Sequence, residues 1–489
     1  QLDMYYVDTL SADTVMRWAI DGMLDGIDPY TEYIPTTEQD EFRTLTSGRY
    51  AGVGATIHTR KEDGRTIIKE PYEGCPAQKA GVRAGDVILT IDGRDVKGLS
   101  VGRVSEMLRG EAGTTFELRV QRPGLKKPLT MKVVRENIQL PAVPWYGFVD
   151  TGKSIGYLYL SSVTDQCARE VRYAVNELKA QGMQSLILDL RENTGGAVSQ
   201  AVEIVGLFVP KGSLVVSTKG KVPATCFEYQ TPSEPIDTLL PIHILVDGVT
   251  ASAAEIISGA LQDLDRATIW GHRTYGKGLV KAIRDVPYRG QLKITTSRYY
   301  IPSGRCIQAY DYRHRTVDGA ATTLPDSLTH EFRTRLGRPV RDGGGIQPDS
   351  VLVVDSIPTM VSDLFYSDYL FDYVTGYVQR HPTIDPPGEF HLSDNEYAAF
   401  ADSIAATDFK YNGRSAIILE QLRQMARIEG YTDTTTTDML EQLGQHLKQG
   451  NVRADLLRHR KHVQPYVEEE IVARYYYQKG SLQHQIAQD

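Results

Sequence analysis

The chain has 489 residues, and its 62 acidic side chains outnumber its 54 lysines and arginines, which gives a formal net charge of −8. This length predicts about three domains, and the acidic balance without a long basic run argues against a nucleic-acid partner. No apolar stretch approaches the roughly 18 residues that a membrane-spanning helix needs, so we expect no integral membrane span. The sequence starts at Gln1 without a signal-like apolar segment, which is compatible with a targeting segment that has been removed.

Residues 1–46 are predicted to form an N-terminal helical region, in which a helix precedes an acidic and aromatic loop. Within VMRWAIDGMLDGI, one face of the helix carries Val15, Trp18, Ala19 and Met23. Such a stripe is typical of packing, so we expect this helix to cover another element rather than to carry chemistry.

Residues 47–136 alternate short strands with one helix. The strands are predicted in GATIHT, TIIKE, VILTIDG and FELRVQR, and the helix in VGRVSEML. This order resembles a PDZ domain. The resemblance implies that a peptide C-terminus adds as a strand beside the helix, with its carboxylate held by backbone amides of a glycine loop at Ala51, Gly52 and Val53.

Two residues at the ends of the PDZ helix have competing interpretations. Ser100 lies in a GxSxG pattern, which marks the nucleophile of some hydrolases, but it follows no buried strand. We therefore expect Ser100 to cap the helix. Arg109, at the other end, either contacts a catalytic core when peptide fills the groove or is a solvated arginine favoured by the helix dipole.

Residues 137–350 alternate strand-like runs with helical ones, for example SLILDL before AVSQAVEIVGLF and IHILVD before SAAEIISGALQ. This alternation predicts an α/β core with helices packed on a mixed sheet. We expect residues 24–35 to pack on that core. Residues 310–343 are polar and rich in glycine, which predicts a long surface loop or a short insertion.

A serine in this region lies where a predicted strand runs into a predicted helix. Ser252 follows HILVD and opens the helix, so the N-terminal amides and the positive end of the helix dipole face any oxyanion formed there. Lys277 follows between two glycines, which permit a tight approach. A lysine that is neutral can take the proton of a serine hydroxyl, which indicates a Ser-Lys hydrolase site. The alternative is a helix contact made of small residues near a surface lysine.

Residues 351–489 are predicted to form a charged helical region, with a loop at 382–390 and a polar break at 432–438. No catalytic pattern occurs there, so these helices serve either subunit assembly, which we favour, or packing within the chain. The chain has no HExxH motif and no CxxC pair among its four cysteines, so we expect no metal and no other cofactor.

Several motifs, in order, resemble the carboxyl-terminal processing peptidases, the tail-specific serine proteases of family S41 with an embedded PDZ domain. They are LDGIDPYTEYIP at 24–35, the PDZ-like stretch, LDLRENTGG at 188–196, the serine and lysine segments, TSRYYIPSGRCIQ at 296–308 and GGIQPD at 344–349. The resemblance makes Ser252 the nucleophile and Lys277 the general base. It also implies a periplasmic or cell-envelope location and terminal helices that make subunit contacts.

The resemblance further assigns supporting residues. The backbone amides of Gly195 or Gly196, together with that of Ala253, are expected to face the developing oxyanion. Asp263 matches another acidic position of the family and is a candidate orienting residue. Because it lies about three helical turns beyond the serine, we expect it to be a local structural acid rather than a proton-transfer partner.

One position departs from the family pattern. Lys281 stands where these peptidases usually have a glutamine that helps to hold the catalytic lysine. If both lysines point to one side of the strand, the second cation disfavours the charged form of Lys277, and a charged Lys281 cannot accept a hydrogen bond. The alternative is that Gly278 turns the chain and Lys281 points to solvent.

Together these features predict a serine endopeptidase that cleaves protein substrates near or from their C-terminal tails, with the PDZ domain binding the free C-terminus. Homo-oligomers and an adaptor protein are the expected partners besides substrates. An alternative is a catalytically weak PDZ scaffold, which the departure at Lys281 motivates. A Ser-His-Asp protease is the third class, but none of the eleven histidines lies in a recognisable catalytic pattern.

Overall fold

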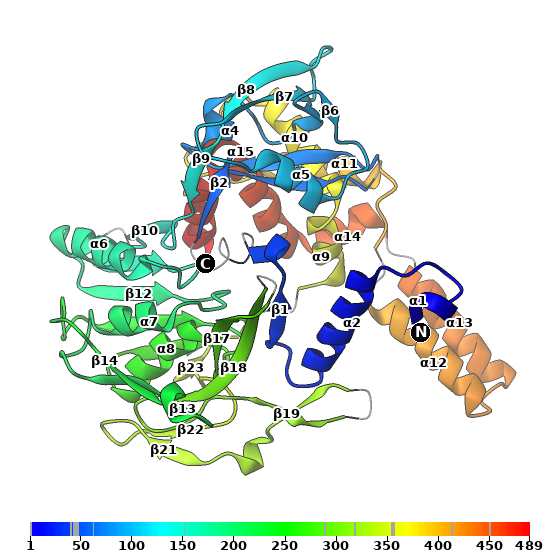
Figure 1. Ribbon diagram of the computed structural model, residues 1–489. Coiled ribbons are helices and arrows are strands. Elements are labelled where there is room, and N and C mark those ends of the chain that lie inside the picture. The colour runs from blue at the N-terminus through cyan, green and yellow to red at the C-terminus, as the bar shows by residue number, and fades with distance from the viewer. Residues whose placement is uncertain are drawn as a thin grey trace. The chain divides into compact units, whose positions relative to one another are not determined.

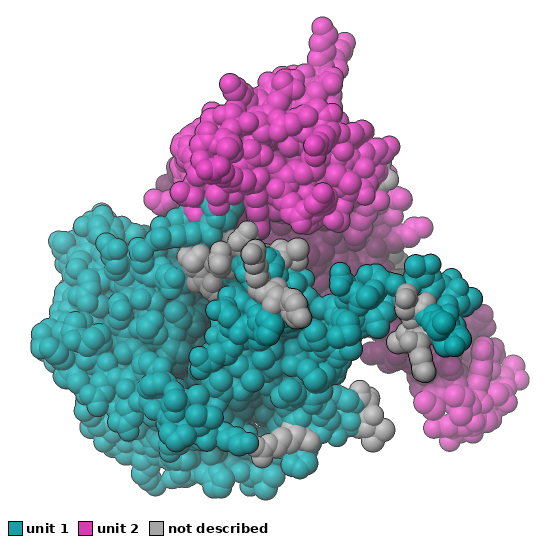
Figure 2. Space-filling model, in the orientation of Figure 1, with its two compact units in different colours: residues 1–50, 139–353 teal, residues 51–138, 354–489 magenta. Residues whose placement is uncertain are grey.

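The computed structural model describes residues 2–39, 42, 48–61, 63–150, 152–287, 290–316, 319–353, 357–411, 414–448 and 451–489. Contacts divide the chain into two compact units, which Figure 2 colours separately: unit 1 comprises residues 1–50 and 139–353, and unit 2 comprises residues 51–138 and 354–489. The chain enters unit 2 within strand β2 (Arg49–Gly52) and leaves it within β9 (Glu136–Gln139). The predicted domain boundaries at 136 and 350 lie close to unit boundaries, whereas the predicted boundary at 46 lies outside the described residues.

A six-stranded sheet forms the centre of unit 1 (Figure 1). Strand β10 is antiparallel to β11, and the other neighbouring strands are parallel. Leu186, Leu188 and Ile244 are fully buried, as expected for parallel strands that are covered on both faces. The prediction of an α/β core with a mixed sheet is therefore confirmed. In sheet order the strands are β10 (Trp145–Phe148), β11 (Ile155–Tyr159), β12 (Ser185–Asp189), β15 (Ile242–Val246), β16 (Thr268–Gly271) and β23 (Ser350–Val351).

Three helices complete this core: α6 (Cys167–Ala180), α7 (Val198–Val205) and α8 (Ala253–Asp263). Helix α6 contacts β10 and β11, α8 contacts β16, and α7 lies between α6 and α8. Their apolar residues join those of the sheet in one buried cluster, in which Val171, Ile204 and Ile256 are fully buried. The helix that follows Ser252 is therefore fixed along its length by the core.

A five-stranded antiparallel sheet forms the second layer of strands in unit 1. It contains β1 (Glu32–Ile34), β13 (Leu214–Gly220), β14 (Phe227–Gln230), β17 (Leu279–Asp285) and β18 (Gln291–Tyr300). The long strand β18 pairs with β1, β13 and β17. Because β1 pairs with the start of β18, the residues just before β1 lie beside a part of the chain that is far away in sequence.

Of the two alternatives for residues 310–343, the long surface loop is wrong, because backbone pairing forms two hairpins there despite the polar side chains. Helix α2 (Ala12–Asp25) forms as predicted, but Trp18 and Met23 are 63% and 64% exposed, so the described part of the chain leaves these two members of the expected packing stripe uncovered. The hairpins are β19 (Tyr310–Arg315) with β20 (Ala321–Thr323), and β21 (Glu331–Arg333) with β22 (Pro339–Arg341).

The first part of unit 2 is an antiparallel sheet with two helices, α4 (Pro76–Lys79) and α5 (Val101–Leu108). Ile88, Val104 and Val120 are fully buried in its core. The hydroxyl of Ser100 accepts the Arg103 N–H at 3.3 Å, so the prediction that Ser100 caps the helix is confirmed. The strands are β3 (Ala55–Thr59), β4 (Thr66–Pro71), β5 (Val87–Ile91), β6 (Arg94–Asp95), β7 (Thr115–Gln121) and β8 (Leu129–Val134).

The second part of unit 2 is helical, as predicted, and none of the helices in the described part of the chain is long and apolar enough to cross a membrane. The predicted loop at 382–390 separates α10 from α11. The predicted break at 432–438 is wrong in its extent, because the Asp433 carboxylate accepts the Thr436 N–H at 2.9 Å and the threonines begin α13. The helices are α9 (Thr359–Phe365), α10 (Asp368–Arg380), α11 (Asp394–Ala405), α12 (Arg414–Ile428), α13 (Thr434–Lys448), α14 (Val452–Arg458) and α15 (Arg460–Gln488).

A buried carboxylate ties the last helix to the loop before α11. Glu468, on α15, is 1% exposed and accepts the Leu392 N–H at 2.7 Å and the Gln464 side-chain amide at 2.6 Å. Burial acts to raise its pKa, but His484 and the other donors outweigh burial and lower the pKa of Glu468 to about 2. For His484, burial acts to lower the pKa, but the hydrogen bonds with Glu468 and the Pro387 carbonyl, together with the nearby glutamate charges, outweigh burial and raise the pKa.

Glu468→Gln is expected to destabilise the protein most between about pH 4.5 and 6.5. The stabilisation that ionised Glu468 gives the folded state is fully present above the carboxyl's unfolded-state pKa of about 4.5. It is lost as the pH falls towards the folded-state pKa of about 2. The stabilisation that protonated His484 gives the folded state is fully present below about pH 6.5, the unfolded-state pKa of histidine. It is lost as the pH rises through the folded-state pKa of His484. Urea unfolding should give a loss of about 2 kcal/mol in this window. Glu429→Gln, at an exposed helix end, is the control, and equal losses for the two variants would contradict the account.

Candidate active site

Ser252 lies in a sharp turn between β15 and α8, as the sequence predicts. Its backbone has φ 57° and ψ −118°, a conformation that residues other than glycine rarely adopt. The flanking backbone is fixed from outside the turn, because the Ala251 N–H donates to the Asn193 carbonyl at 2.9 Å and the Thr250 hydroxyl donates to the Leu190 carbonyl at 2.8 Å. The core therefore holds the serine at the end of the parallel sheet and at the N-terminus of a helix.

A fully buried carboxylate, Glu255, joins the serine to the lysine segment. Its Oε2 accepts the backbone N–H of Ser252 at 2.8 Å and that of Lys277 at 2.9 Å. Its Oε1 accepts the Gly276 N–H at 2.7 Å and the Thr274 hydroxyl at 2.5 Å. One side chain in the first turn of α8 thus fixes the backbone of both candidate catalytic residues.

The surroundings of Glu255 act on its charge in opposite directions. Burial raises the pKa of Glu255, and the four donated hydrogen bonds act against that rise. Four donors also match the acceptor capacity of an ionised carboxylate, which has no proton to donate. The geometry is therefore that of a buried carboxylate paired with backbone N–H groups rather than with a cation.

Tyr299, on β18, joins the same two segments from their carbonyl side. Its hydroxyl lies 3.1 Å from the Ser252 carbonyl oxygen and 2.6 Å from the Lys277 carbonyl oxygen, and the residue is 1% exposed. Burial raises the pKa of Tyr299 well above its usual value, so the hydroxyl keeps its proton and can donate. The serine and lysine segments are thus linked by both their N–H and their C=O groups.

The glycines around Lys277 allow the predicted close approach. Gly276 has φ +84°, and a Cβ there would lie 2.4 Å from Ala309 Cβ. A Cβ on Gly278 would lie 2.8 Å from the Gln308 backbone nitrogen, and the Gly278 N–H donates to Gln308 Oε1 at 2.8 Å. Side chains at either position would push the lysine segment away from residues 308–309.

Both lysines contact one aromatic ring. The Nζ of Lys277 lies 4.5 Å from the centroid of the Tyr30 ring, and the Nζ of Lys281 lies 4.4 Å from it. Of the two alternatives for Lys281, the structure therefore agrees with the one in which both lysines point to one side and contradicts the solvent-facing one. Burial, followed by the charge of Lys277 and a hydrogen bond with it, lowers the pKa of Lys281 to about 6.

The glycine pair after β12 approaches the serine closely. A Cβ on Gly195 would lie 2.8 Å from Ser252 Cβ and 2.7 Å from the Ala253 nitrogen, and a Cβ on Gly196 would lie 2.1 Å from the Val163 carbonyl oxygen. The assignment of Gly195 as an oxyanion donor needs correction, because its N–H donates to Asn193 Oδ1 at 2.8 Å. Gly195 instead leaves room for the serine.

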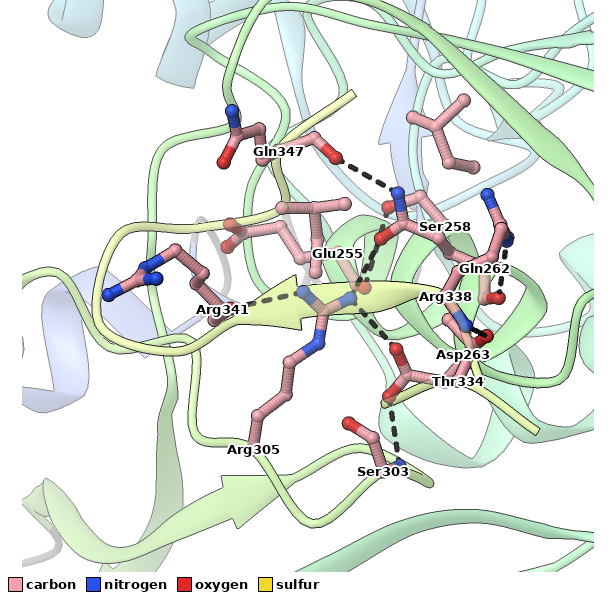
Figure 3. A network of polar contacts seen from close by, with 12 residues as sticks. Glu255, Ser258, Gln262, Asp263, Ser303, Arg305, Thr334, Arg338, Arg341 and Gln347 are labelled. Carbon is pink, nitrogen blue, oxygen red and sulfur yellow. Dashed lines mark hydrogen bonds and ion pairs between the residues drawn. The ribbon is translucent and has the colours of Figure 1, made fainter. Parts of the chain in front are cut away.

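Asp263 does not orient the lysine. It ends α8, whereas Ser252 precedes that helix, and its carboxylate is occupied elsewhere (Figure 3). Asp263 Oδ1 lies 2.9 Å from Arg305 Nη2 in a fully buried ion pair, and Oδ2 accepts the Ser303 N–H at 2.9 Å. The expectation of a structural acid is correct.

The predicted carboxylate loop lies in unit 2. The Ala51 carbonyl accepts the Gly110 N–H at 3.4 Å, and the Val53 carbonyl accepts the Ala77 N–H at 2.8 Å. The structure therefore brings Ala51 beside the end of α5, where Arg109 is the C-cap residue. Gly52 is buried between these two anchored positions.

Glu255 was not predicted as a site residue, although the sequence carries a signal for it. Ser252 and Glu255 have the S-x-x-E spacing of a capping box, in which the glutamate reaches back to the N-cap amide. Neither Tyr299 nor Asn193 has such a signal. Asn193 is fully buried and donates to the Leu160 carbonyl at 2.7 Å, which only the folded turn reveals.

Comparisons with known proteins agree with this arrangement. Residues 154–314 match peptidase family S41, residues 67–122 match the PDZ domain, and residues 360–489 match the probable PDZ-protease C-terminal helical domain. A carboxy-terminal-processing protease of Bartonella bacilliformis is 35% identical over 307 residues, which are 62% of this chain and 69% of that protein.

Two further similarities are weaker. A probable CtpA-like serine protease of Staphylococcus aureus is 32% identical over 310 residues, and the match covers 63% of this chain and 60% of that protein. The solved structure of a photosystem II D1 C-terminal processing protease has a TM-score of 0.39 and 28% identity, covering 71% of this chain and 84% of that one. The chain thus belongs to peptidase family S41, the carboxy-terminal-processing serine proteases, and carries a PDZ domain.

Proposed function

We propose that this serine-type peptidase is an endopeptidase that cleaves protein substrates near or from their C-terminal tails, with Ser252 as the nucleophile and Lys277 as the general base. The observation that carries the proposal is the double link between the two segments. Glu255 binds their N–H groups, and the Tyr299 hydroxyl lies within hydrogen-bond distance of both carbonyls. A site that must transfer a proton between two side chains needs their backbones fixed relative to one another.

The chemistry follows from these roles. Neutral Lys277 takes the proton of the Ser252 hydroxyl while Oγ bonds to the scissile carbonyl carbon. The backbone amides of Ala253, at the start of α8, and Gly196 are the proposed donors to the oxyanion, aided by the helix dipole. The lysine then gives its proton to the departing amine as the C–N bond breaks. Water, activated by the same lysine, releases the acyl group from the serine.

The PDZ domain is the proposed binding site for the substrate C-terminus. The extended peptide adds beside β3 and α5, and the amides of Ala51, Gly52 and Val53 hold its carboxylate. Arg109, at the end of α5, is the proposed contact that reports an occupied groove to the peptidase unit. A cell-envelope location, subunit contacts through the terminal helices and an adaptor protein are supported only by the family resemblance.

Ser252→Ala and Lys277→Ala are each expected to abolish cleavage of an unstructured substrate with a free apolar C-terminus, while the circular dichroism spectrum stays that of the parent. The reason is that each variant removes one of the two groups that exchange the proton. Ser258→Ala, on the same helix, is the control, because the Ser258 hydroxyl donates only within α8. Substantial cleavage by both variants would contradict the assignment, and binding without cleavage by the parent would favour the scaffold alternative.

Glu255→Gln should lower kcat by at least about 100-fold, because a glutamine must direct its NH2 group at backbone N–H groups that now donate to a carboxylate. Turnover measured at saturating substrate tests this expectation. Glu203→Gln, an exposed carboxylate on α7, is the matched control. A kcat within threefold of the parent would show that the carboxylate does not position the site.

Amidation of the substrate C-terminus should weaken binding about tenfold or more, because it removes the charge that the glycine loop would bind. The affinity is best measured on Ser252→Ala, which binds without turnover. Acetylation of the peptide N-terminus is the control and should leave the affinity unchanged. Equal affinities for the free and amidated tails would refute this role of the PDZ domain.

A further inference from the structure

The site contains a second amine that the proposed chemistry does not use. Lys281 and Lys277 place their Nζ atoms 4.4 and 4.5 Å from the centroid of the same Tyr30 ring, and Lys277 is among the groups that lower the pKa of Lys281. Lys281 is part-buried on β17, where the register with β18 shifts between Val280 and Lys281. Both amines therefore share one sheltered place beside the serine segment.

The ring that both amines contact is neutral. The Tyr30 hydroxyl donates to the Tyr275 hydroxyl at 3.3 Å and accepts from the Tyr312 hydroxyl at 3.0 Å. Burial, followed by these two hydrogen bonds, raises the pKa of Tyr30, so its hydroxyl keeps its proton. A neutral ring attracts a cation through its face, but it cannot neutralise two adjacent ammonium groups.

Among the described residues, the other charges near Lys281 offset a second cation only in part. Lys293, on β18, is a further positive charge, and its Nζ lies 2.6 Å from Glu32 Oε1. The charge of Asp28 favours the charged form of Lys281, but burial and the two neighbouring lysines act more strongly against that form. A pair of ammonium groups here carries unfavourable charge repulsion as well as the cost of burial.

We propose that Lys281 is a positioning residue that shares a single proton with Lys277, so that the pair supplies a neutral amine to Ser252 at neutral pH. The inference rests on the proposed function, in which Lys277 is the general base. Two amines held close together lose their first proton more readily than either amine would alone, and the proton that remains belongs to the pair.

In each catalytic cycle the two lysines together gain one proton and lose one proton. When the shared proton moves from Lys277 to Lys281, the lone pair of Lys277 Nζ is free and accepts the proton of the Ser252 hydroxyl as Oγ bonds to the substrate carbon. The pair then carries two protons, and the two adjacent ammonium groups repel each other. Lys277 passes its proton to the leaving nitrogen as the C–N bond breaks, and the pair returns to one proton.

The test is the pH dependence of kcat/KM for Lys281→Met, which keeps an apolar stem and removes the amine. The rising limb of the pH–rate curve should move upward by about one pH unit or more, which is a tenfold or larger loss near pH 7. At alkaline pH the variant and the parent should converge. Lys281→Gln should show the same displacement, which provides a second measurement if the methionine variant does not fold.

An exposed lysine elsewhere in the same sheet provides a matched control. Lys219 lies 4.6 Å from the Tyr300 ring centroid in the same sheet and is exposed, so Lys219→Met should leave the curve unchanged. Curves of Lys281→Met and the parent that coincide, or a loss that is uniform at all pH values, would overturn the shared proton while Lys277→Ala stays inactive. An active Lys277→Ala would instead overturn the proposed function itself.

Discussion

The buried carboxylate of Glu255 is the contact on which the geometry of the site depends. A charge without a counter-ion in a protein core is costly unless donors surround it, and here all four donors come from the segments that carry the serine and the lysine or precede the lysine. The carboxylate therefore cannot be satisfied unless both segments are in place. Folding of the core and assembly of the site become one event, since α8 carries Glu255 and is buried throughout.

The same reasoning explains the unusual backbone at Ser252. A positive φ at a serine costs free energy of order 1–3 kcal/mol, and it persists only where the surroundings determine it. Glu255 holds its N–H, the Tyr299 hydroxyl lies near its carbonyl, and Gly195 leaves space on the side where a Cβ would collide. Farther along α8, the buried ion pair of Asp263 and Arg305 anchors the helix to residues 303–305, which continue from β18 (Figure 3).

Local patterns predicted the local features of this protein. The strand that runs into a helix at Ser252, the tight glycines around Lys277 and the Ser100 cap all depend on neighbouring residues, and each was predictable from spacing alone. The contacts of Glu255 were also encoded, by its capping-box distance from the serine, and the place of Asp263 three turns along the helix correctly predicted a structural acid. Gly195 was misassigned because the side chain of Asn193 takes its N–H, a contact that a glycine pair does not reveal.

Features that depend on long-range pairing could not be predicted. Tyr30 reaches the lysines only because β1 pairs with β18, and the sequence does not specify that partner. Tyr299 stands beside another tyrosine, and only the sheet register decides which hydroxyl faces the site. The position of Lys281 depends on a shift of register between β17 and β18. The alternation of side chains along a strand predicted the side to which Lys281 points, but a register shift interrupts that alternation.

The central claim is that Ser252 is the nucleophile and that Lys277 activates it. Labelling with a fluorophosphonate, which bonds covalently to activated serine hydroxyls, followed by peptide mass spectrometry, tests this claim most directly. The account predicts one labelled peptide that contains Ser252, with labelling lost in Lys277→Ala and in the unfolded parent. Labelling of a different serine, or equal labelling of Ser252 in the parent and in Lys277→Ala, would contradict it.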